Sequence, residues 1–488
     1  MKRILTVVAV AVFTIGRISL AYADSTEVMS MLESMKQQMV KMQQTIDQQN
    51  LRIQQLESQK ALEIPQPNIP VQTQPTATSD ADFQKGISDN IGKAVPWMKG
   101  LKYSGDFRLR YENFKYYDKN NDAGSTGTGA DGTRNRFRIR LRWGIEKDFG
   151  DDWKTGFRLA TGTATEPTGE NVTLGSPGDF NFKTILIDRA YALYEPKSLK
   201  DQGLLKGVKV GAGKFENPFL RYSTSLVWDP DVAPEGAYEQ ANLQLVSTEN
   251  TKVNGQVTLG QFIVNENNIQ DSNAEIFGYQ GTLNISSYLF KSDLPVDFTT
   301  AVSLYDYPNW SQTVLASQNT SAASYLRTNS TLAGGFRVLD IYPELVFYVN
   351  RMPVTLWYDY AKNLANDGTD NNPLTLGNEF YNQDTAFGFG AKIGKMKAKG
   401  AWDAYWSYFQ IPADAVVAAF NDSDFGGPGT NGYTNRKGHK FGIGYKLTDN
   451  LALNYTGYLV APFNSTTLVA NSQNESVWRS QMDATYSF

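Results

Sequence analysis

The sequence predicts an all-β fold: a transmembrane antiparallel β-barrel of about 16 strands, preceded by an N-terminal α-helical coiled coil. Three observations predict the barrel. Apolar and polar side chains alternate with a period of two from Leu101 onward. The alternating segments are about 10–15 residues long, and a tilted transmembrane strand needs about 9–11. Short turns also alternate with long loops rich in Gly, Asn and Thr, which is typical of outer-membrane barrels.

Residues 1–23 have the features of a secretory signal peptide. Lys2 and Arg3 supply the positive start, an apolar stretch follows from Ile4 to Ile15, and Ala21-Tyr22-Ala23 has the form of a cleavage site. An N-terminal membrane anchor is the alternative. The apolar stretch is too short for a spanning helix, so we expect a signal peptide.

Residues 24–63 are predicted to form a periplasmic helix with a coiled-coil seam. Residues of the seam alternate at spacings of four and three: Val28, Leu32, Met35, Met39, Met42, Ile46, Gln49, Ile53 and Leu56. This is the a/d pattern of a coiled coil, and it implies self-association because a single helix has no partner for the seam. The alternative is a helix that packs on its own barrel.

Residues 64–100 are predicted to be a linker and a short segment before the barrel. The stretch 64–80 contains four prolines among Gln and Thr, a composition that gives an extended, semi-rigid spacer. Residues 81–98 are compatible with a short amphipathic helix.

Residues 101–488 are predicted to form the outer-membrane barrel. Polar residues alternate with apolar and aromatic ones in the first two segments, so one face is strongly charged and the other apolar. The expected strands are 101–116, 134–148, 152–163, 182–195, 206–215, 237–247, 251–265, 274–288, 295–307, 336–350, 353–363, 383–396, 398–410, 436–447, 449–462 and 475–488. An 18-strand barrel is the alternative, because residues 320–350 could hold two strands.

The last strand ends with Met482, Ala484, Tyr486 and Phe488 at a spacing of two. A terminal aromatic residue after such a strand resembles the signal that the barrel-insertion machinery reads. We therefore expect that machinery, and outer-membrane lipid, as partners.

Composition argues against several other classes of protein. The chain has 488 residues, no cysteine and a formal net charge of −4. Thiolate metal sites and thioether-bound haem are excluded, a nucleic-acid binder would be basic, and we expect no cofactor and no metal. An enzyme is disfavoured, because His439 is the only histidine and no nucleophile motif accompanies it.

Several stretches resemble the family of "putative porins" of Gram-negative outer membranes, which is distantly similar to phosphate-selective and general trimeric porins. The resemblance is carried by YSGDFRLRYENF (103–114), RNRFRIRLRWG (134–144), GKFENPF (213–219), LVWDPDVAPEG (226–236), ADAVVAAFNDSDFGGPGTN (413–431) and RKGHKFGIGYKLTDNLAL (436–453). It implies passive diffusion of small hydrophilic solutes across the outer membrane. It also implies a homotrimer.

Charged residues in two regions are the candidate pore constriction. A predicted arginine ladder lies on the polar face of the first three strands: Arg108, Arg110, Arg136, Arg138, Arg140, Arg142 and Arg158. The third long loop, 216–236, carries Asp229, Asp231 and Glu235. We expect this loop to narrow the pore opposite the ladder, which would favour anions. The alternative is that the charges solvate a wet wall and pair with Asp106, Glu112 and Glu146.

The sequence leaves two functions open. The first is a porin for small hydrophilic solutes, and for anions in particular. The second is a plugged structural barrel, a sheath or an anchor for a periplasmic or redox partner.

Overall fold

The computed structural model describes residues 98–117, 133–219, 224–267, 272–288, 294–310, 335–365, 383–426, 434–463 and 476–488. The chain divides into two compact units, Met1–Phe83 and Gln84–Phe488. The predicted signal peptide, coiled coil and nearly all of the linker lie outside the described residues and stay predictions. No helix within the described ranges is long and apolar enough to cross a membrane.

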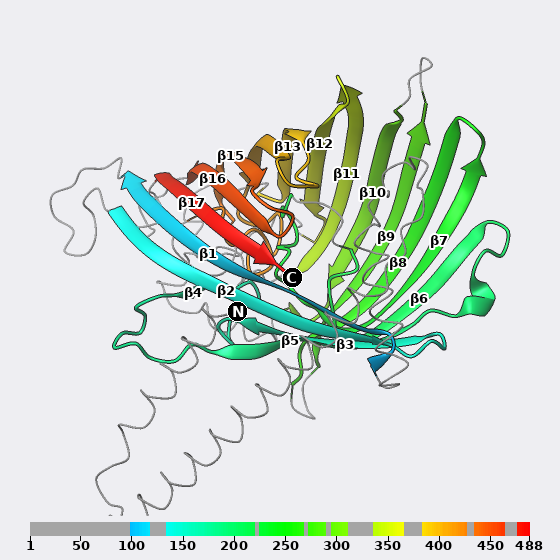
Figure 1. Cartoon of the computed structure of the whole chain (residues 1–488), viewed down its shortest axis with the longest axis horizontal. Helices are drawn as coiled ribbons and strands as arrows, with labels where there is room; N and C mark the ends of the chain where they lie inside the picture. Colours follow the sequence, from blue (N-terminus) through cyan, green and yellow to red (C-terminus); the bar gives the residue numbers. More distant parts are fainter. Residues whose placement is uncertain are drawn as a thin grey trace, which may run out of the picture. The chain divides into compact units, whose positions relative to one another are not determined.

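Strands make up most of the described part of the second unit (Figure 1). A short 3-10 helix, η2 (Lys197–Leu199), lies between two of them. Sixteen strands are long, and β4 (Val172–Thr173) has two residues. The long strands are β1 (Leu101–Tyr117), β2 (Thr133–Asp148), β3 (Trp153–Thr161), β5 (Ile185–Tyr194), β6 (Leu205–Lys214), β7 (Glu235–Ser247), β8 (Thr251–Asn265), β9 (Ala274–Ser287), β10 (Val296–Tyr307), β11 (Phe336–Val349), β12 (Met352–Asn363), β13 (Thr385–Gly394), β14 (Trp402–Ile411), β15 (Arg436–Lys446), β16 (Leu451–Pro462) and β17 (Ser476–Ser487).

Each predicted strand overlaps one of these long strands. The largest difference is at the start of β14, which begins at Trp402 and not at residue 398. A turn occupies the intervening residues, because Ala401 donates its backbone N–H to the carbonyl of Ala398 and Gly400 has a φ of 84°. A positive φ of this size is one that glycine adopts readily.

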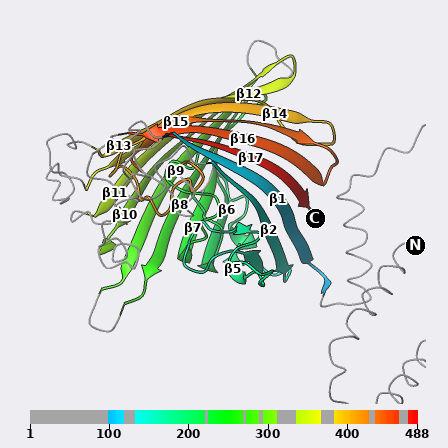
Figure 2. The ribbon, with the colours of Figure 1, turned by 90° about the vertical axis from the view of Figure 1, so that its left-hand side faces the viewer.

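The strands form one closed antiparallel barrel. Each long strand pairs with its chain neighbours, and the barrel closes where β1 pairs with β17, in the register Arg110↔Asp483. Figure 2 shows β16, β17, β1 and β2 side by side in one curved wall. The predicted number of 16 spanning strands is confirmed. The alternative of 18 is wrong, because β10 pairs directly with β11 and leaves no place in the wall for two more strands.

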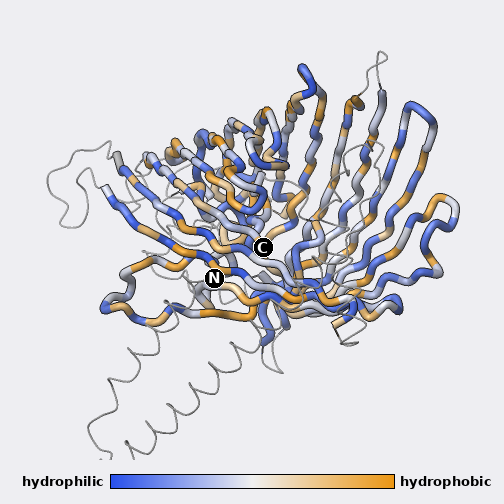
Figure 3. The backbone as a smooth tube through the Cα atoms, in the orientation of Figure 1, coloured by the Kyte–Doolittle hydropathy of each residue, from blue (hydrophilic) through white to orange (hydrophobic). Residues whose placement is uncertain are grey.

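Alternation of side chains gives the barrel an apolar outside and a charged inside. In β2, Phe137 and Trp143 are 53 % and 38 % exposed, whereas Arg138 is only 4 % exposed. Successive residues of a strand point to opposite faces, so the arginines face the lumen. The alternation is visible along the strands in Figure 3. A soluble sheet protein has the opposite arrangement, with its apolar faces covered.

The two ends of the barrel differ. At the short-turn end, strands are joined by connections such as 149–152, 248–250 and 350–351. Both termini of the barrel lie at this end, since the backbone N–H of Gly105 donates to the carbonyl of Phe488 over 2.9 Å. The other end carries the long connections, which include loop 2 (162–184), loop 3 (215–234) and loop 7 (412–435).

Loop 2 departs from the sequence prediction of a strand 152–163 followed by one simple loop. β3 ends at Thr161, and the chain leaves the wall until β4 returns to pair with Arg138 and Ile139 of β2. The side chain of Thr161 accounts for this exit: its hydroxyl accepts from the N–H of Leu141 and donates to the carbonyl of Glu170. These bonds stabilise the bend by which residues 162–171 reach the charged inner wall.

Candidate functional site

The inner wall of β1 and β2 places like charges directly opposite each other. Arg108 pairs in register with Arg140, and Arg110 with Arg138. Like charges at such positions destabilise a sheet unless acidic groups compensate them. The guanidinium groups are also little exposed, since Arg110 and Arg138 are each 4 % exposed. The structure supplies the compensating groups from β1, β5 and β17 of the wall and from loops 2, 3 and 7.

The first source of carboxylates is β1 itself. Glu112 is fully buried and forms ion pairs with Arg136 and, at 2.5 Å, with Arg479 of β17. Asp106 accepts from Arg140 at 2.9 Å and from Arg142 at 2.6 Å. Buried ion pairs of this kind need every charge to have a partner. Of the alternative partners expected from the sequence, Asp106 and Glu112 contact the arginines, whereas Glu146 contacts Lys102 at 3.7 Å.

The inward part of loop 2 is the second source. Glu170 lies 2.9 Å from Arg158 and 3.3 Å from Arg142, and the carbonyl of Asn171 accepts from Arg138 over 2.8 Å. Burial, together with the nearby carboxylate of Asp231, raises the pKa of Glu170 to about 8. Glu170 therefore changes charge close to neutral pH, inside the charged cluster.

Loop 3 reaches the arginines through one of its three predicted carboxylates. Asp231 lies 3.7 Å from Arg140 and 3.8 Å from Arg142. Asp229 faces away from them. It accepts backbone N–H groups of Asp231 and Ser423, each over 2.9 Å, and burial beside other carboxylates raises its pKa well above the usual range.

Glu235, the third predicted carboxylate, is the first residue of β7 and not part of the loop. It pairs with Lys214 at 2.9 Å and is 63 % exposed. Of the three predicted carboxylates, Asp231 alone is therefore placed beside the arginine wall.

Loop 7 supplies a partner of the arginine wall that the sequence analysis does not identify. Its described part, 412–426, enters the barrel, and Asp424 contacts Arg479 at 2.6 Å and Arg110 at 3.0 Å. Burial opposes ionisation of Asp424, but these two guanidinium groups hold its pKa well below the usual range. The apolar run 415–420, AVVAAF, was the available signal, since a loop exposed to water would not carry it.

Loops 3 and 7 pack together inside the barrel on an apolar core. Trp228 of loop 3 stacks on Phe420 of loop 7, with ring centroids 5.4 Å apart, and meets Tyr305 of β10 edge-on at 5.5 Å. Backbone hydrogen bonds also join the loops, from Asp229 to Phe420 and from Asp422 to Ser225. The same buried cluster includes residues of β7 to β14, so the described parts of the two loops pack against this part of the inner wall.

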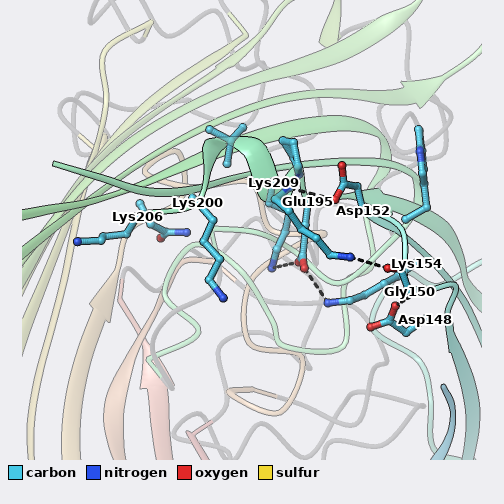
Figure 4. A pocket seen from close by; sticks show the side chains of 14 residues that line it. Asp148, Gly150, Asp152, Lys154, Glu195, Lys200, Lys206 and Lys209 are labelled. Carbon is cyan, nitrogen blue, oxygen red and sulfur yellow. Dashed lines mark hydrogen bonds and ion pairs between the residues drawn. The ribbon is translucent and has the colours of Figure 1, made fainter. Parts of the chain in front are cut away.

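A polar cavity of about 440 Å³ lies between loop 2, loop 3 and the wall. Its lining combines five carboxylates with one lysine: Glu166, Glu170, Asp188, Asp231, Glu235 and Lys214. A second cavity of about 400 Å³ opens at the short-turn end (Figure 4). There Glu195 accepts from Lys154 at 2.7 Å and pairs with Lys209 at 3.5 Å, and Lys197, Lys200 and Lys206 add positive charge. Both cavities carry charged side chains and have room for hydrated solutes.

The comparisons with known proteins identify the family of this chain. A family model described as "Putative porin" matches residues 125–331 and 311–461. The chain belongs to this porin family. The resemblance inferred from the sequence is thereby confirmed, and the porin is an outer-membrane channel protein and not an enzyme.

Two solved structures are among those similar to the porin. One is the Salmonella typhi OmpF complex with daunomycin, at 12 % identity and a TM-score of 0.43, covering 80 % of this chain and 97 % of that one. The other is Pseudomonas putida OprB at high pH, at 10 % identity and a TM-score of 0.46, covering 83 % and 97 %. No curated protein matches the sequence.

Proposed function

We propose that this porin lets small hydrophilic solutes, and anions in preference to cations, diffuse passively through a lumen narrowed between loop 3 and the arginine wall. The observation that carries the proposal is the approach of Asp231 to within 3.7–3.8 Å of Arg140 and Arg142. Loop 3 thereby extends from the apolar core beside β10 to the opposite charged wall. Solutes would pass the polar cavity that remains beside it.

Charge counting supports the anion preference. Eight arginines, the seven predicted ones and Arg479, form ion pairs with seven carboxylates. Protonation of Glu170 below pH 8 removes one of those negative charges. Buried guanidinium N–H groups of Arg108, Arg136 and Arg138 also have no hydrogen-bond partner among the described residues. The cluster therefore retains positive charge and free donors, which favour anions.

The arrangement in the cell is part of the proposal. We place the short-turn end, with both barrel termini, in the periplasm together with the predicted coiled coil 24–63. The Met-rich seam would hold a homotrimer, and Phe488 would present the insertion signal. The constriction residues that we assign are Asp231 and the seven arginines predicted from the sequence.

The test is the reversal potential of the purified porin in a planar bilayer under a KCl gradient. We expect anion preference, which should weaken in Arg138→Gln and Arg140→Gln variants. Arg337→Gln is the matched control, because that arginine is 54 % exposed and pairs only with the exposed Asp306 within the described residues. A cation preference in the unmodified protein would contradict the proposed selectivity.

A plugged structural barrel is the second candidate function. The apolar packing of Trp228, Phe420 and Tyr305 inside the barrel favours it, because such a core resists opening. Absence of any conductance from correctly folded protein would support this candidate, and a sheath or anchor would then be the better assignment.

A further inference from the structure

The outward face of β14 and β15 carries a polar patch at the long-loop end of the barrel, where these neighbouring strands (Figure 2) meet loop 7. Phe409 of β14 is 2 % exposed and points into the barrel, so its neighbours Tyr408 and Gln410 point outward. On β15, His439 lies opposite Tyr408, and Lys437 lies opposite Gln410. Residues opposite each other share one face of a sheet. We call these four outward residues the rim patch.

The rim patch is rich in hydrogen-bond donors and contains no carboxylate. Lys437 supplies an ammonium group, Gln410 an amide N–H₂ and Tyr408 a hydroxyl. The Nδ1 atom of His439 is buried without a hydrogen-bond partner among the described residues. A proton on Nδ1 would have no acceptor, so we place the proton of the neutral ring on Nε2, where it can be donated to a ligand. Such a set of donors suits an anion.

The positive charge of Lys437 has no counter-charge in the wall. Its Nζ atom lies 5.5 Å from the ring centroid of Phe463, and no carboxylate pairs with it among the described residues. Lys440, three residues along the same strand, points inward and lies 2.8 Å from Asp422. Lys437 therefore presents an uncompensated charge to the surroundings of the barrel.

Those surroundings are the boundary between lipid tails and head groups. The ring of His439 stacks on that of Trp406, with centroids 5.8 Å apart, and lies 5.1 Å from that of Tyr408. Leu459 of β16 lies opposite His439 on the other side, and Trp406 and Leu459 are 43 % and 45 % exposed. Outward aromatic rings at the end of a membrane strand are typical of head-group depth.

One kind of ligand satisfies both the donors and the charge. Acyl chains accept no hydrogen bonds, and water does not neutralise Lys437. The phosphate of an anionic lipid supplies oxygen acceptors and negative charge at head-group depth. We infer that the rim patch binds the phosphate of an anionic lipid, with Lys437 as its counter-charge and His439 as a donor. The site lies on the outside of the wall, so the inference does not depend on the proposed channel function.

The first test uses the fact that His439 is the only histidine of the chain. Isotope-labelled histidine in the full chain, purified without a histidine tag, therefore gives one imidazole signal in nuclear magnetic resonance. Titration with dihexanoyl phosphatidylglycerol in a neutral detergent should shift this signal until it saturates. Dihexanoyl phosphatidylcholine, whose head group has no net charge, should shift it much less. Equal shifts with both lipids, no shift with either, or a full shift with inorganic phosphate alone would each overturn the inference.

The second test removes the charge. Lys437→Gln should weaken binding of phosphatidylglycerol at least about ten-fold, because a hydrogen bond to a charged group contributes on that scale. Lys147→Gln is the matched control, since the Nζ atom of Lys147 also lies over a phenylalanine, 5.8 Å from the ring centroid of Phe149, but at the short-turn end. The control should leave the titration unchanged. Equal losses in the two variants, or no loss in Lys437→Gln, contradict the site.

The third test separates donation by His439 from its packing. His439→Phe keeps an aromatic ring on Trp406 and removes the donor, whereas His439→Gln keeps a donor and removes the ring. Native mass spectrometry of the phosphatidylglycerol complex should show lost binding for His439→Phe and retained binding for His439→Gln. The reverse order would mean that the histidine only packs. Conductance should be unchanged in every variant, so lipid binding and the porin function are tested separately.

Discussion

Replacing Glu112 by Gln is the most informative perturbation of the arginine wall. The carboxylate is fully buried and contacts Arg136 and Arg479, with Arg138 at 3.9 Å. Glutamine has nearly the same shape but no charge. The variant therefore leaves buried guanidinium groups without their counter-ion, and breaking a buried ion pair in this way costs roughly 3–5 kcal/mol.

The measurement is the free energy of unfolding in urea, with the folded fraction in lipid vesicles followed by gel mobility. Asp306→Asn is the matched control, because Asp306 and Arg337 form an exposed pair at 3.2 Å that should be worth less than about 1 kcal/mol. Adding Arg479→Gln to Glu112→Gln should recover part of the loss, since it removes an uncompensated charge. A loss for Glu112→Gln no larger than that of the control would refute the reasoning.

Three further predictions concern residues that lie inside the barrel. Raising the pH through about 8 ionises Glu170 and should lower the anion-to-cation permeability ratio, while Glu170→Gln should abolish that pH dependence of the reversal potential. Trp228→Ala removes the ring that stacks on Phe420 and should destabilise the packed loops by roughly 3–5 kcal/mol, seen as faster proteolysis of loop 3. Gly278→Val should displace Phe219, whose ring lies 2.5 Å from where a Cβ would be, and should increase single-channel noise by loosening the same loop.

The sequence alone was enough to predict the barrel and the face of the strand on which each charged side chain lies. The alternation in β2 places Arg136, Arg138 and Arg140 on one side of the strand whatever their partners are, and the cost of burying arginine in lipid decides which side is inside. Strand number followed from the same periodicity. These properties depend on local sequence, so they were accessible without a structure.

The partners of those charges were not accessible in the same way. Arg110 contacts Asp424, which is 314 residues further along the chain, because loop 7 folds into the barrel. Nothing in a period-two pattern specifies which long loop turns inward. The apolar run 415–420 does indicate that loop 7 turns inward. It can be interpreted in this way only once Trp228 and Tyr305 are known to belong to the apolar core that the run joins. The end of β3 at Thr161 could not be predicted for the same reason. The bend there depends on the hydrogen bond from Thr161 to the carbonyl of Glu170 in loop 2.

Glu112 has a consequence for how the protein is assembled. It lies on β1, between Arg136 of β2 and Arg479 of β17, where the first and last strands meet (Figure 1). Until β17 arrives, the hairpin of β1 and β2 carries facing arginines without Asp483 or Asp424 nearby. An incomplete chain therefore has an electrostatically unfavourable seam, whereas the complete chain neutralises it upon closure. Complete barrels would therefore be stable in the membrane, whereas truncated chains would fail to close and would be degraded.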